Sequence, residues 1–152
     1  MQKEFYSLPL AVEKLMREPG DQSHHTRHRE LAKCSLQQSV EQNLHLLLTT
    51  AFGEFPADEL FGCSIWENDF DNLTSAPKMK ESIRQSILQS VQQHENRLGK
   101  VRVELMIQQE ELPDAKGRRV KKRIEITISG MLQLTNEKFI HRDSFFVGPL
   151  SY

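Results

Sequence analysis

The sequence has few cysteines, no long apolar run and no glycine-rich phosphate loop. Cys34 and Cys63 are its only cysteines. Two are too few for a disulfide framework, and neither has a second cysteine or a histidine at the spacing of a structural zinc site. No apolar run approaches the roughly 20 residues of a membrane helix, and charged residues interrupt the N-terminal segment where a signal peptide needs its apolar core. We therefore expect a reduced, cytoplasmic protein without a membrane partner, metal or cofactor.

Basic residues are missing from one region of the chain and concentrated in another. Residues 51–76 contain no Lys or Arg, whereas many lie within residues 97–123, and the net charge of -1 conceals this asymmetry. Such a chain can meet oppositely charged neighbours at either end. The distribution favours assembly with other proteins over general nucleic-acid binding.

The length predicts one domain preceded by an N-terminal region. With 152 residues and 38% hydrophobic content, the chain can build a modest core. We place an apolar segment and a polar linker in residues 1–34 and the domain in residues 35–152. The apolar segment is compatible with a helix after Pro9 and is expected to dock on the domain or on a partner. The linker, from Asp21 to Lys33, is expected to be mobile, and its histidines at 24, 25 and 28 lack the further ligands of a metal site.

Two stretches have the periodicity of amphipathic helices. The first, residues 36–52, is preceded by a Ser35-to-Gln38 capping box and followed by Gly53, which suits a left-handed helix end. The second opens near residues 74–77 and repeats apolar residues every four positions. Its expected stripe consists of Met79, Ile83, Ile87, Leu88, Val91 and Leu98.

The rest of the chain has the two-residue period of half-buried strands. Residues 101–108 alternate in this way, a turn follows at 112–117, and a second strand runs to 128, so 101–128 is predicted to be a hairpin. Gly130 is expected to bend or bulge the second strand, and residues 135–137 turn the chain into a last extended segment. This segment is predicted to be either an edge strand or an arm that pairs with another chain. The predicted fold is α+β, with a small antiparallel sheet of about three strands covered on one face by two to three helices.

The acidic segment after the first helix also carries large apolar residues. Trp66 and Phe70 lie four residues apart and are predicted to act as anchors, either against the domain's own helices or in a partner's groove. Glu95 and Arg97 lie between a helix end and a strand start. They are interpreted as a structural ion pair or a partner contact, and neither reading is catalytic.

Three short motifs carry a resemblance to a known family. They are LLLTTAFGE from Leu46 to Glu54, the triplet Leu60-Phe61-Gly62, and the run His94-Glu95-Asn96-Arg97. Over roughly residues 35–147 the chain resembles the baseplate wedge proteins of contractile tails, a family also labelled lysozyme-like, and most closely its TssE branch from type VI secretion systems. The family commonly has Glu-Pro-Arg at the last motif, where this chain has Asn96 in place of the proline.

The resemblance implies a structural role in a large hetero-oligomer. A wedge subunit of this kind is held by other wedge proteins, and its small sheet seeds the first sheath ring, which an edge strand can do by accepting a partner strand. The positions that mark the family are Gly53, Glu54, Phe61, Gly62, Glu95 and Arg97. The further contact candidates are Trp66, Phe70 and the 139–147 strand, with Phe139, Phe145, Phe146 and Val147. Whether the machine is a phage tail, a secretion system or a related injector is left open.

Two other functions are weighed against this one. A peptidoglycan-cleaving hydrolase would need two carboxyl groups in contrasting environments, and the sequence shows only scattered carboxylates such as Glu54, Glu59 and Glu95. A nucleic-acid-binding role would rest on the basic run 116–123, which has no interleaved aromatic residue. We therefore expect no enzymatic activity and no catalytic residue.

Overall fold

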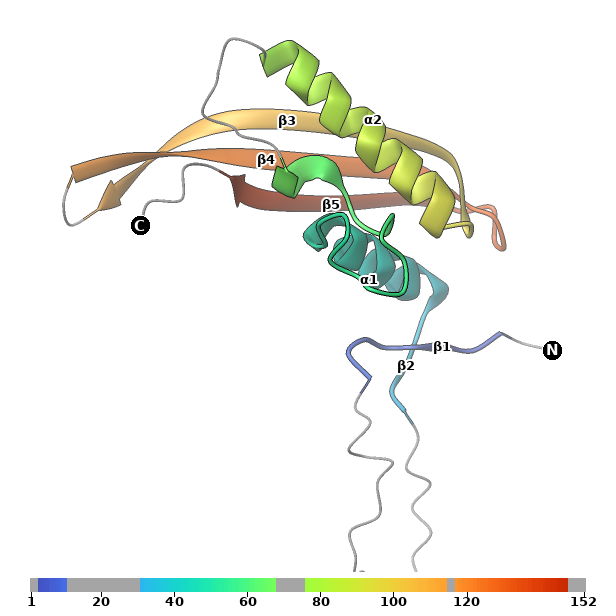
Figure 1. Ribbon diagram of the computed structural model, residues 1–152. Coiled ribbons are helices and arrows are strands. Elements are labelled where there is room, and N and C mark those ends of the chain that lie inside the picture. Colours follow the sequence, from blue (N-terminus) through green and yellow to red (C-terminus); the bar gives the residue numbers. More distant parts are fainter. Residues whose placement is uncertain (1–2, 11–30, 68–75, 115–116, 148–152) are drawn as a thin grey trace, which may run out of the picture.

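The computed structural model describes residues 3–10, 31–67, 76–114 and 117–147, which contain two α-helices and a three-stranded antiparallel sheet (Figure 1). Helix α1 spans Leu36–Thr49 and α2 spans Ala76–His94, with a short 3-10 helix, η2, at Ser64–Glu67 between them. The sheet follows in the order β3-β4-β5, formed by Leu98–Asp114, Gly117–Leu132 and Lys138–Val147. The predicted α+β fold is confirmed.

Helix α1 begins at the predicted cap. The Gln38 amide donates to Ser35 Oγ at 3.1 Å, and the Ser35 amide donates to Gln38 Oε1 at 3.0 Å. Four apolar residues of one face are buried in the core: Val40, Leu44, Leu47 and Leu48. The helix ends at Thr49, earlier than predicted, because the backbone becomes extended at Thr50. The hydroxyls of Thr49 and Thr50 donate to carbonyls of the last turn. Gly53 is left-handed, with φ of 76°, but it lies in the turn beyond the helix, so its predicted role as the helix end is wrong.

Helix α2 crosses the sheet and packs mainly on β3 (Figure 1). Ile83, Ile87 and Val91 are fully buried, as the four-residue repeat predicted, while Met79 and Leu88 are half-buried against the same core. Leu98 does not extend this stripe. It is the first residue of β3 and enters the core from the sheet.

Strands β3 and β4 form the predicted hairpin and are paired from Leu98 with Leu132 to Asp114 with Gly117. Their inward residues meet in cross-strand pairs such as Val103 with Ile128 and Leu105 with Ile126. The irregularity expected at Gly130 lies instead in β3, between Gly99 and Arg102. A Cβ at Gly130 would lie 2.7 Å from the Gly99 carbonyl oxygen, so this glycine permits the close approach of the two strands.

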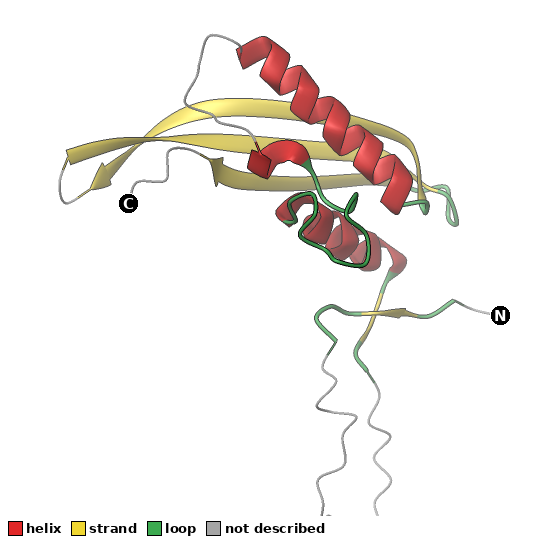
Figure 2. Cartoon of the chain, viewed as in Figure 1, coloured by secondary structure: helices red, strands yellow, loops and turns green. Residues whose placement is uncertain are grey.

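Strand β5 returns beside β4 after a turn in which Asn136 is left-handed. Both helices lie on one side of the sheet (Figure 2). The alternation of β5 sends Phe139, His141, Asp143, Phe145 and Val147 toward that side. Within the described residues, β5 pairs with β4 alone, which leaves it an edge strand.

The N-terminal residues form a small ribbon at one end of the molecule. Strand β1, Phe5–Tyr6, pairs antiparallel with β2, Lys33–Cys34, and the Ser7 amide donates to the Ala32 carbonyl at 2.7 Å. We call residues 3–10 the strap. It pairs as a strand at Phe5–Tyr6 and bends at Leu8 and Pro9, and the helix predicted after Pro9, the mobile linker and its histidines fall almost entirely on residues 11–30, outside the described residues. The predicted boundary at residue 34 stays a prediction.

Candidate partner-binding site

The most buried charged group in the described part of the chain is Glu95, which is only 1% exposed. It follows α2 directly, and Arg97 immediately precedes β3. The Arg97 guanidinium donates to both carboxylate oxygens, from Nε at 2.7 Å and from Nη2 at 2.6 Å. The pKa of Arg97 is raised because its hydrogen bonds to Glu95 stabilise the charged form. The bidentate pair fixes the angle between α2 and β3, as the structural reading of these residues predicted.

Other elements complete this ion pair. Asn43 of α1 donates to Glu95 Oε2 at 2.8 Å, and Arg97 Nη1 donates to Ser39 Oγ at 2.9 Å. The Phe5 ring of the strap lies over the guanidinium, with its centroid 5.8 Å from Cζ. One ion pair therefore joins the helices, the sheet and the strap.

The loop after α1 is built around two glycines and a carboxylate. The Ala51 amide donates to Glu54 Oε2 at 2.8 Å, and the Gly53 amide donates to the Glu59 carbonyl at 2.8 Å. Gly62 has φ of 133°, and a Cβ there would lie 2.6 Å from the Thr50 carbonyl oxygen. Gly53, Glu54 and Gly62 therefore shape the loop from within, and none of the three offers an apolar side chain to a partner.

Phe61 packs inside the domain. Its ring meets His94 edge-on, with centroids 5.3 Å apart, and it also contacts Phe55 at 5.7 Å. The carboxylate of Asp58 is 3.1 Å from His94 Nε2, which ties the loop to the end of α2. The more exposed apolar side chains of this loop are Phe55 and Leu60, at 46% and 61%. Sequence reasoning did not select these two as contacts.

Trp66 is anchored to its own domain, but it also faces solvent. Its Nε1 donates to the Leu48 carbonyl at 2.9 Å, and its ring packs edge-on against Phe145. The side chain is still 41% exposed. Packing against its own domain therefore leaves part of Trp66 accessible to a partner, and the two predicted roles do not exclude each other. Phe70, its expected companion, lies outside the described residues.

The last strand divides its side chains between the core and the surface. Phe139 and Val147 are buried, and Phe145 is half-buried beneath Trp66. Phe146 points to the opposite face and is 53% exposed. Of the four named contact candidates on this strand, Phe146 therefore offers the most side-chain surface, while Phe139 and Val147 serve the fold.

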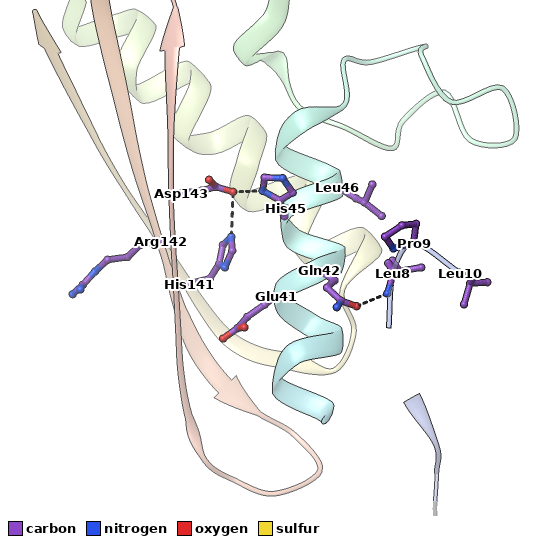
Figure 3. A pocket seen from close by; sticks show the side chains of 10 residues that line it. All are labelled: Leu8, Pro9, Leu10, Glu41, Gln42, His45, Leu46, His141, Arg142 and Asp143. Carbon is purple, nitrogen blue, oxygen red and sulfur yellow. Dashed lines mark hydrogen bonds and ion pairs between the residues drawn. The ribbon is translucent and has the colours of Figure 1, made fainter. Parts of the chain in front are cut away.

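A groove of about 830 Å³ lies between the strap, α1 and β5 (Figure 3). The outer face of α1 forms its floor, the strap residues Leu8 to Leu10 form one wall, and His141 to Asp143 of β5 form the other. His45 Nδ1 contacts Asp143 Oδ2 at 2.5 Å, which joins the floor to the β5 wall. The Leu8 amide donates to Gln42 Oε1 at 3.0 Å, which joins the floor to the strap. Local sequence patterns do not predict this groove, because the groove brings together segments that lie far apart in the chain.

The site shows no metal-binding arrangement and no membrane segment in the described ranges. Among those residues, no group of three or more His, Cys, Asp and Glu side chains is placed to hold a metal ion. None of the described helices is long and apolar enough to cross a bilayer.

Comparison with known proteins gives one family and one related fold. Residues 34–137, more than half of the chain, match the family described as baseplate wedge protein gp25. A crystal structure of a protein from Geobacter sulfurreducens, provisionally named a tail lysozyme, has a TM-score of 0.55 and 21% identity; the alignment covers 80% of this chain and 100% of that one. This identity establishes a shared fold alone. No curated protein matches with significance.

The family match begins just before α1 and ends in the turn before β5. It therefore includes the Glu95–Arg97 pair, the glycine-shaped loop and the β3–β4 hairpin. This chain belongs to the family of baseplate wedge protein gp25.

Proposed function

We propose that this chain is a structural, non-enzymatic wedge subunit of a contractile injection machine of the type VI secretion kind. It acts in the cytoplasm, holds other wedge proteins, and templates sheath assembly by accepting a partner strand at the edge of its sheet. Membership in a baseplate family supports the assembly, and the one-sided pairing of β5 supports the strand addition.

The β5 edge is the observation that carries the proposal. An unpaired edge presents main-chain N–H and C=O groups that an extended segment can satisfy. The Ser144 amide donates to Asp143 Oδ1 at 3.1 Å, so this amide is directed to a side chain of its own strand. By the two-residue period of a strand, the Arg142 amide faces the same edge. These two amides define the stretch on which a partner strand would pair.

Two of the carboxylates considered for a hydrolase, Glu54 and Glu95, have structural roles. Glu95 is buried against Arg97, and Glu54 accepts a loop amide. Their environments favour a scaffold over a pair of carboxyl groups flanking a sugar. The hydrolase alternative is tested by assaying cell-wall release with the wild-type protein. Robust lysis that a Glu54, Glu59, Glu95 triple substitution removes would favour the hydrolase, provided that the triple variant remains folded.

Strand addition is tested by substituting one edge residue. We expect Arg142→Pro to reduce copurification of the co-expressed sheath and wedge proteins at least tenfold, because proline removes the amide that a partner strand needs. Arg142→Ala, which keeps the amide, is the matched control and should retain the partners. Deleting the whole strand is less informative, since Phe139 and Val147 would leave the core.

The proline variant is first checked for a thermal transition and a circular-dichroism spectrum like those of Arg142→Ala. Equal partner recovery by the two folded variants would reject strand addition at β5. If neither variant nor the wild type recovers any sheath or wedge protein, the proposed function itself is rejected.

A further inference from the structure

The groove between the strap and β5, which we call the strap groove, has an apolar half. Leu8 and Leu10 of the strap are 41% and 45% exposed, and Leu46 on the floor is 44% exposed. Pro9 completes this half of the lining. Figure 3 shows Leu46 extending from α1 toward Pro9 and Leu8. Apolar side chains gathered around one cavity are typical of a contact surface.

The other half of the groove includes the free edge of β5. His141 and Asp143 point toward α1, whereas the Arg142 side chain extends away from the groove (Figure 3). Arg142 nevertheless lines the cavity, so it contributes its main chain to the wall. The apolar surface of the strap and the unpaired backbone of β5 therefore open into the same cavity.

The strap wall is held in place before any partner arrives. The Leu8 amide binds Gln42 of α1, and Lys33 Nζ lies 2.9 Å from Glu4 Oε1 across the ribbon. Phe5 lies over Arg97, so the strap is also attached to the most buried ion pair of the domain. Because the strap is already fixed, it loses less conformational entropy when a partner binds than a flexible segment would.

We infer that the strap groove receives alternate apolar side chains of an extended partner segment, whose main chain pairs with β5. This inference rests on the proposed strand addition and assigns the strap a role in it: recognition of the partner's side chains. The partner segment carries apolar residues at every second position, facing Leu8, Leu10 and Leu46. An extended segment suits the site better than a helix because a helix leaves the β5 amides without main-chain partners.

A second copy of this chain suits the site less well. Two β5 edges paired antiparallel about Arg142 would place two arginines opposite each other, and like charges in that position destabilise a sheet. The occupant is therefore assigned to a different protein of the assembly.

The test compares two aspartate substitutions at exposed leucines. Leu46→Asp places a charge in the strap groove, whereas Leu134→Asp places one in the β4–β5 turn, where the leucine is 63% exposed. Each tagged variant is co-expressed with the same candidate sheath and wedge proteins, and partner recovery is measured per unit of bait. We expect at least a tenfold loss for Leu46→Asp and less than a twofold change for Leu134→Asp. Leu10→Ser, on the strap itself, should also reduce recovery.

The outcomes separate this inference from the function on which it rests. Full recovery by Leu46→Asp and Leu10→Ser, together with a loss in Arg142→Pro, would overturn the role of the groove and leave strand addition standing. Full recovery by Arg142→Pro would overturn both. A wild-type chain that is dimeric by light scattering, and that Leu46→Asp converts to a monomer, would assign the groove to a second copy and also overturn the inference.

Discussion

At the scale of single residues, the fold depends on a few buried side chains that are held by several hydrogen-bond partners. Glu95 is the clearest case, because its carboxylate receives hydrogen bonds from Arg97 and from Asn43 of another helix. The sequence indicated the pair, since its members lie only two positions apart between predicted elements. It did not indicate Asn43, Ser39 or Phe5, because those contacts depend on the packing of distant segments.

Removing the Glu95 charge should destabilise the protein strongly. We expect Glu95→Gln to lower the free energy of unfolding by about 3 kcal/mol, since breaking a buried pair leaves the partner charge uncompensated. Urea denaturation followed by circular dichroism measures this change. Glu81→Gln, at an exposed pair with Arg84, is the control and should have little effect. If Glu95→Gln lowers the free energy of unfolding by less than about 1 kcal/mol, the pair does not contribute strongly to the stability of the domain.

The two cysteines should differ in reactivity. Cys63 is fully buried, and this burial raises the pKa of its thiol to about 11, from an ordinary value of 9.0. Cys34 is half-buried. At pH 8 a thiol reagent should therefore label Cys34 in the native protein and reach Cys63 only after denaturation. Rapid labelling of both cysteines in the native state would contradict the burial of Cys63.

The raised pKa of Cys63 also fixes the sign of its contribution to stability. The unfolded state loses this proton first, so the contribution is fully present below pH 9 and decreases as the pH rises toward 11. Cys63→Ala should therefore lose less stability than the wild type over this interval.

At the scale of elements, local patterns predicted most of the helices and strands. The capping box set the start of α1, the four-residue repeat identified the buried face of α2, and the two-residue alternation identified the β3–β4 hairpin. The predictions were wrong at positions where tertiary contacts, rather than local sequence patterns, determine the structure. Leu98 fits the helical repeat of α2, yet the chain has already turned into β3, and Gly130 accommodates an irregularity that belongs to the neighbouring strand.

The loop between α1 and η2 provides a matched pair of glycine substitutions. Both Gly53 and Gly62 have positive φ, but a Cβ at Gly53 would meet open space, whereas one at Gly62 would meet the Thr50 carbonyl oxygen at 2.6 Å. Gly53→Ala should cost about 1 kcal/mol from backbone strain alone. Gly62→Ala should cost about 3 kcal/mol or more, because the backbone must also shift. Equal midpoints in urea for the two variants would contradict the close approach at Gly62.

At the scale of the whole molecule, the arrangement presents an edge strand and an apolar groove side by side. The sequence predicted that the last extended segment, Phe139 to Val147, is either an edge strand or an arm that pairs with another chain, and the structure pairs it with β4. It could not predict the groove, since Leu8, Leu46 and Arg142 come together only when the strap, α1 and β5 are all in place. Phe139 and Val147 were predicted to be contact candidates because they belong to the apolar last strand, yet these side chains complete the core.

The same arrangement explains how one small domain can be both stable and able to assemble. The buried pair at Glu95 and Arg97 holds the helices, the sheet and the strap together, while β5 and Leu46 remain accessible. Assembly at this edge would then need little rearrangement of the domain.

Amide hydrogen exchange at the β5 edge tests the central claim most directly. It compares the free chain with the chain bound to its sheath and wedge partners, and follows the amides of Arg142 and Ser144. We predict exchange at least 100-fold slower in the bound state, since a partner strand would accept hydrogen bonds from both amides. Exchange at the same rate in the two states, with binding established independently, would show that the partners do not pair with β5.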